Sequence, residues 1–156
     1  MKLNTIGLDQ VKARDISNSL NELLANFQIY YQNLRGIHWN IKGKNFFDLH
    51  VKFEELYDDA NIKVDEIAER ILTLSNTPLH TFEDYISHAK VPIGKNISND
   101  EDAVKLIVMS ISVLLKLERN ILAQASNAND EGTNSMMSDF ITEQEKTVWM
   151  MNAWLG

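Results

Sequence analysis

Apolar residues recur at steps of three and four along most of the chain, which is the period of an amphipathic α-helix. This pattern predicts long helices over 9–38, 45–74, 99–126 and 134–154. In the second of these, the apolar side chains fall in an arc about 100° wide, as expected for a helix that faces a core. The arc consists of Phe46, Leu49, Phe53, Leu56, Tyr57, Ala60, Val64, Ile67, Ile71 and Leu74.

Turn signals between these helices predict how they connect. Lys42-Gly43-Lys44 separates the first two helices and favours an antiparallel hairpin. The segment 75–98 contains both prolines and one short helical stretch, 81–88, and we interpret it as a crossover. Ser98 with Glu101 three residues later has the spacing of a capping box that would open the third long helix. Two hairpins joined by one long crossover predict an all-α, ferritin-like four-helix bundle, with 1–156 as one domain.

Polar residues on 45–74 form a strip beside the apolar arc. His50 and Asp65 in this strip are fifteen residues apart, which is roughly 22 Å along a helix that rises ~1.5 Å per residue. Ligand bonds from nitrogen and oxygen are only ~2.0–2.2 Å long, so these two side chains cannot hold one metal ion within one helix. The strip comprises His50, Glu54, Asn61, Asp65 and Glu69, whereas Glu55, Lys63 and Glu66 point elsewhere.

A second copy of the chain could bring an Asp65 side chain to the His50 that its own helix keeps apart. Antiparallel apposition of two such helices places the His50 end of one beside the Asp65 end of the other, and each two-fold pair would carry two equivalent sites. His38 lies before the hairpin turn and His50 after it, so the two histidines sit at one level. Taken singly, each residue is typical of a helix cap or a solvated face. Together, His38, His50, Asp65 and Glu69 make four plausible ligands for iron.

The stretch HWNIKGKNFFDLHVKFE, 38–54, and the stretch DEIAER, 65–70, resemble two segments of the Dps family, the mini-ferritins. This resemblance implies that His38 and His50 come from one subunit, and that Asp65 and Glu69 come from its two-fold neighbour. It also implies Glu54 as a supplementary ligand. The Glu-x-x-His motif of other ferritin-like di-iron proteins is absent from the sequence, which argues against a metal site inside the bundle.

Further roles follow from the same resemblance. Trp39 matches an aromatic residue beside the site that intercepts oxidising equivalents. Asp130 and Glu131 match, more loosely, acidic residues that line pores for iron entry, although acids are also favourable at a helix N-terminus.

The resemblance implies a ferroxidase that oxidises Fe(II), preferably with hydrogen peroxide rather than dioxygen. It further implies a hollow dodecamer that stores ferric mineral and protects against oxidative damage. Zinc is a possible surrogate for iron at such ligands. The alternatives are a DNA-compacting or metal-sequestering shell without catalysis, and an interaction protein that keeps only the shell.

Charge and composition narrow these choices. The net charge is −7 and the pI about 5.0, and only Lys2, Lys12 and Arg14 are basic near the N-terminus, so DNA binding by a basic tail is not expected. There is no cysteine, so any metal must bind through nitrogen and oxygen. The segment 1–8 does not resemble a secretory signal, and 106–117 is shorter than the ~20 apolar residues that cross a bilayer. We therefore expect a cytoplasmic protein.

Overall fold

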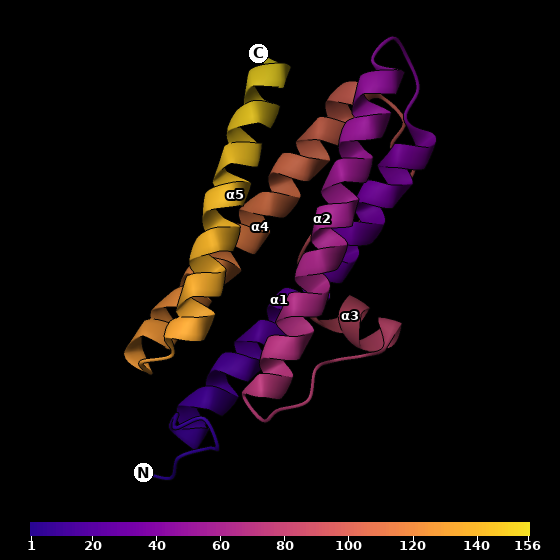
Figure 1. Cartoon of the computed structure of the whole chain (residues 1–156). Helices are drawn as coiled ribbons and strands as arrows, with labels where there is room; N and C mark the ends of the chain where they lie inside the picture. Colours follow the sequence, from indigo (N-terminus) through magenta and orange to yellow (C-terminus); the bar gives the residue numbers. More distant parts are fainter.

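The computed structural model describes residues 1–156 as five helices, with one isolated β-bridge between Leu3 and Asp9. The hairpin of α1 and α2 lies beside the hairpin of α4 and α5, and α3 lies in the crossover that joins them, against α1 (Figure 1). The predicted all-α bundle of two hairpins is confirmed, and α5 begins three residues earlier than predicted. The helices are α1 (Gln10–Asn40), α2 (Phe46–Thr73), α3 (Phe82–His88), α4 (Asp100–Asn127) and α5 (Glu131–Leu155).

The start of α4 differs by one residue from the predicted capping box. Asn99, not Ser98, caps this helix: its Oδ1 accepts from the backbone N–H of Asp102 at 2.8 Å, and its Nδ2 donates to Asp102 Oδ2 at 2.6 Å. Asparagine caps at least as well as serine. The backbone carbonyl of Ser98 instead accepts from the N–H of Lys42 at 2.8 Å, which fixes the end of the crossover to the α1–α2 turn.

The core runs along the whole bundle and contains 32 buried apolar residues. The apolar arc predicted for α2 supplies Leu49, Phe53, Ala60, Ile67 and Ile71 to it. Because these residues face inward, the polar strip beside them is left on the surface of α2. No helix has both the length and the apolar character that a bilayer-spanning segment needs.

Two buried asparagines on α1 fix the crossover. The Oδ1 of Asn26 accepts from the backbone N–H groups of Lys90 at 2.7 Å and Val91 at 2.9 Å. The Oδ1 of Asn33 accepts from the N–H of Gly94 at 2.9 Å. A Cβ at position 94 would lie 2.5 Å from a leucine side chain of α4, so any larger residue would force that side chain to shift. The irregular segment after α3 is therefore held against α1 through its main chain.

The interior also contains polar groups that the sequence pattern did not reveal. Lys63 is 4% exposed, and its ammonium donates to Asp59 at 2.5 Å and to Glu143 at 2.6 Å. Glu118 is fully buried and accepts from Gln144 Nε2 at 2.6 Å. Desolvation raises the pKa of Glu118 to about 8, although the hydrogen bond from Gln144 and the charge of Lys63 act in the opposite direction. Glu118 is therefore mainly protonated at neutral pH.

Candidate metal centre

The two predicted histidine ligands lie face to face at the α1–α2 hairpin. His38 is in the last turn of α1 and His50 is near the start of α2, and their imidazoles stack with ring centroids 3.7 Å apart and planes 9° apart. Nδ1 of His38 is 2.6 Å from the backbone oxygen of His50, and Nδ1 of His50 is 2.7 Å from that of His38. A carbonyl oxygen only accepts, so each Nδ1 carries the hydrogen.

This arrangement determines the tautomer of both rings. With the hydrogen on Nδ1, each neutral imidazole keeps its lone pair on Nε2, where a metal ion can bind. Ligating histidines commonly donate their other ring N–H to a carbonyl in this way, which also fixes the ring orientation. The hairpin therefore holds both imidazoles in a fixed orientation through Nδ1.

Two aromatic rings pack on the histidine pair, and one of them binds a nearby carboxylate. The ring of Phe46 stacks on His50 at 4.8 Å between centroids, and the edge of Tyr57 meets His38 at 5.3 Å. Glu54 lies one helical turn after His50 and is exposed. The Tyr57 hydroxyl donates to Glu54 Oε1 at 3.2 Å. Desolvation and this hydrogen bond both raise the pKa of Tyr57, so the phenol stays protonated and remains a donor to Glu54.

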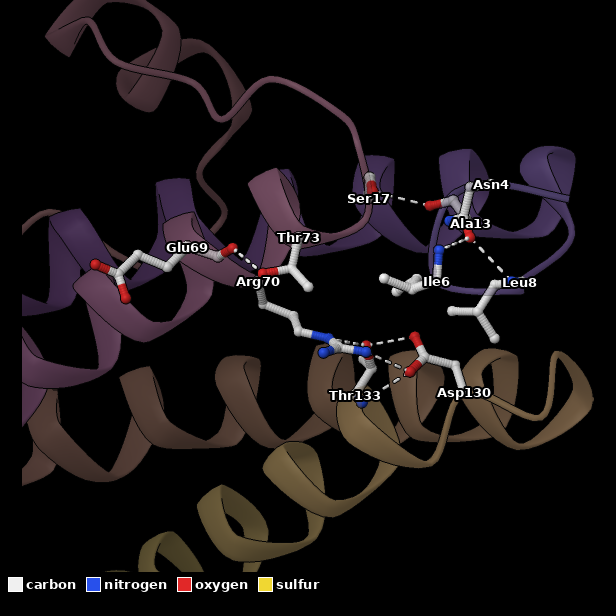
Figure 2. Close-up of polar contacts among 10 residues, drawn as sticks. All are labelled: Asn4, Ile6, Leu8, Ala13, Ser17, Glu69, Arg70, Thr73, Asp130 and Thr133. Carbon is white, nitrogen blue, oxygen red and sulfur yellow. Dashed lines mark hydrogen bonds and ion pairs between the residues drawn. The ribbon is translucent and has the colours of Figure 1, made fainter.

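Asp65 and Glu69 lie one turn apart in the second half of α2, and both are exposed. The backbone carbonyl of Glu69 accepts from the hydroxyl of Thr73 at 2.8 Å, while its carboxylate extends away from the neighbouring Arg70 contacts (Figure 2). Within one subunit, no three histidine, aspartate or glutamate side chains lie close enough to hold a metal ion. The four predicted ligands therefore form two separate pairs within one chain.

Trp39 follows His38 in sequence but lies in different surroundings. Its indole is 56% exposed, and the guanidinium of Arg35 lies 4.8 Å from the ring centroid. The oxidisable ring that packs on the histidine pair is that of Tyr57. Sequence reasoning placed Tyr57 only in the apolar arc. Its position, seven residues after His50 and therefore on the same side of the helix, is the signal that could have indicated this contact.

The two pore candidates have different environments. Asp130 is 2% exposed and caps α5, since its Oδ1 accepts from the backbone N–H of Thr133 at 3.0 Å. Its Oδ1 also accepts from Arg70 Nη2 at 2.6 Å, and its Oδ2 accepts from Thr133 Oγ1 at 2.5 Å (Figure 2). A Cβ on Gly132 would lie 2.7 Å from the Arg70 guanidinium, so a glycine leaves room for this contact. The carboxylate of Asp130 is thus engaged within the subunit. Glu131 is exposed and remains the pore candidate.

Comparisons with known proteins agree with this architecture. Residues 17–156 match the family model for the ferritin-like domain. The crystal structure of a Dps protein from Vibrio cholerae O1 superposes with a TM-score of 0.98 at 49% identity, covering 100% of this chain and 98% of that chain. The chain belongs to the Dps family. The resemblance inferred from 38–54 and 65–70 is therefore confirmed, together with the ferritin-like fold.

Two further members of the Dps family show the range of the similarity. The DNA protection during starvation protein of Porphyromonas gingivalis is 39% identical, over 97% of this chain and 96% of that protein. Dps from Staphylococcus aureus is 34% identical, with a TM-score of 0.88, covering 92% of this chain and 96% of that chain. The Vibrio protein is described as a member of a broad superfamily of ferritin-like diiron-carboxylate proteins.

Proposed function

We propose that this Dps-family protein is a ferroxidase and iron-storage protein. It oxidises Fe(II) at sites shared between two copies of the chain and stores ferric mineral inside a hollow shell of twelve copies. The observation that carries the proposal is the stacked pair of His38 and His50. Both imidazoles keep Nε2 available for a metal, yet their own subunit brings no carboxylate pair beside them.

The carboxylates that the histidine pair lacks lie further along α2, the helix that carries His50. Asp65 and Glu69 are exposed on α2, and neither carboxylate has a hydrogen-bond partner within the subunit. Two antiparallel copies of α2 bring the His50 end of each helix to the Asp65 end of the other, roughly 22 Å along the helix at ~1.5 Å per residue. A two-fold axis then creates two identical sites in each pair.

The donor set suits iron as a substrate. Imidazole nitrogen binds Fe(II), and carboxylate oxygens are hard donors that favour Fe(III). Binding at both ligand types should therefore promote oxidation, with Glu54 adding a further carboxylate. With hydrogen peroxide as oxidant, two Fe(II), one peroxide and two protons give two Fe(III) and two waters. Zinc takes the same nitrogen and oxygen ligands but has no redox chemistry, so it should inhibit by occupying the site.

The surface charge suits cation uptake. A net charge of −7 per chain raises the local concentration of Fe(II) around an assembly. Glu131, exposed at the start of α5, is the proposed pore residue. The protection of DNA that the name of the Porphyromonas relative states would, in this chain, follow from removal of Fe(II) and peroxide.

The test is Fe(II) oxidation by hydrogen peroxide without oxygen, followed by ferric absorbance. Asp65→Asn combined with Glu69→Gln should abolish rapid oxidation while the shell still assembles. Glu55→Gln with Glu66→Gln removes the same charge from other faces of α2 and should oxidise iron like the parent protein. Equal rates in all three proteins would refute the assigned site and leave a shell with a binding role.

A further inference from the structure

One aromatic side chain touches both kinds of proposed ligand. The ring of Tyr57 meets His38 edge-on at 5.3 Å, and its hydroxyl donates to Glu54 at 3.2 Å. We propose that Tyr57, rather than Trp39, is the side chain that intercepts the one-electron oxidant released when peroxide oxidises Fe(II). This inference rests on the proposed ferroxidase function.

The packing around Tyr57 favours this role. Its ring is held between His38 and Tyr31, whose ring centroid lies 5.9 Å away at an interplanar angle of 83°. Edge-to-face contacts of this kind are favourable and restrict the ring orientation. The phenol is therefore fixed beside the histidine pair with its O–H directed to Glu54. Phe46 also packs on the pair, but its ring has no O–H bond to break.

Trp39 is less suited to lose an electron. The Arg35 guanidinium lies 4.8 Å from the centroid of its indole. A cation over the ring face is attracted by the electrons of the ring, and it opposes the positive charge that forms when one electron leaves the indole. Tyr57 has no such cation over its ring, and it can lose a hydrogen atom to give an uncharged radical.

The chemistry balances without a further reagent. One Fe(II) transfers an electron to hydrogen peroxide, whose O–O bond breaks to give hydroxide and a hydroxyl radical. That radical takes the hydrogen atom from the Tyr57 hydroxyl, so one O–H bond breaks, another forms in water, and a phenoxyl radical remains. A second Fe(II) supplies the electron, and the solvent the proton, that restore the phenol. A proton also converts the hydroxide to water, and two Fe(II) have reduced one peroxide.

The experiment measures the escape of hydroxyl radical with a nitrone spin trap during anaerobic oxidation of Fe(II) by peroxide. Tyr57→Phe keeps the ring and its packing but lacks the O–H bond, so trapped radical should rise severalfold while iron is still oxidised. Trp39→Phe should release no more radical than the parent. Tyr30→Phe is the matched control, because Tyr30 packs against Phe27 in the core rather than against a histidine.

Freeze-quenched samples give a second readout. The parent should show a tyrosyl signal that narrows when ring-deuterated tyrosine is incorporated, and Tyr57→Phe should lose it. If Tyr57→Phe oxidises iron but traps no more radical than the parent, or if only Trp39→Phe leaks radical, the role of Tyr57 is refuted. The ferroxidase proposal would survive either result, because it fails only when Asp65→Asn with Glu69→Gln oxidises iron normally.

Discussion

Subunit complementation gives the sharpest prediction about the shared site. One variant, His38→Ala with His50→Ala, keeps only the carboxylate half. The other, Asp65→Asn with Glu69→Gln, keeps only the histidine half. Each variant assembled alone should have no complete site. Mixed shells of the two should regain activity, because a histidine pair from one subunit can meet intact carboxylates from its two-fold neighbour.

The expected recovery follows from the geometry. His50 and Asp65 are fixed on one rigid helix roughly 22 Å apart at ~1.5 Å per residue, so no chain can complete its own site. In shells mixed randomly in equal amounts, half of the two-fold pairs contain one of each variant, and each such pair has one complete and one doubly deficient site. Mixed shells should therefore recover about one quarter of the parental sites.

The assay uses co-expressed variants with two different affinity tags, so that sequential purification yields only mixed shells. Size-exclusion chromatography checks assembly, and the amplitude of rapid Fe(II) oxidation counts the sites. If removal of both histidines disturbs the hairpin, His50→Ala alone replaces the double variant in the experiment. No recovery in correctly assembled mixed shells would show that the site is not shared across this two-fold axis.

Three further outcomes are expected. Burial raises the pKa of Glu118 from 4.5 to about 8 in the folded chain, so the free energy of unfolding should fall as pH rises between these two values, by about 1.4 kcal/mol per pH unit from this group. Glu118→Gln should remove this pH dependence in urea titrations, and an equal pH dependence in parent and variant would contradict the assignment. Asn26→Ala leaves the buried N–H of Val91 and the part-buried N–H of Lys90 without their acceptor, and should lower the free energy of unfolding by about 2 to 4 kcal/mol. The exposed Asn18→Ala should lower it by about 0.5 kcal/mol or less in the same urea titration. Finally, linear DNA should not be retarded in low-salt gels, since the chain carries a net charge of −7 and phosphate binding needs clustered lysine and arginine; a clear shift would revive the DNA-compacting alternative.

The sequence predicted features that follow from periodicity. The long helices, the hairpin at Gly43 and the position of His38 level with His50 depend on local spacing, and each is present in the structure. Asp65 and Glu69 were predicted as ligands from a second subunit because the spacing of Asp65 from His50 excludes a shared site within one helix, and this assignment stays a prediction. Family resemblance added Glu54, whose hydrogen bond from Tyr57 became visible only in the folded hairpin.

Contacts between distant segments were beyond sequence reasoning. The burial of Lys63 depends on Glu143, eighty residues away on α5, which provides the second carboxylate for its ammonium. Asp130 was a pore candidate through its loose match to acidic residues of the Dps family, yet its buried carboxylate forms an ion pair with Arg70 of α2. Neither partner has a fixed sequence spacing, so no motif could have indicated these pairs.

Because the crossover is held through its backbone, its exposed side chains can be changed without loss of docking. Asn26 and Asn33 bind the backbone of 90–94, not its side chains, and Lys90 and Ile93 project into solvent. Residue identity at these two exposed positions is therefore almost irrelevant to docking, except that proline at 90 would remove a required N–H. A fluorescent label or an affinity handle attached at position 93 should leave the bundle unchanged.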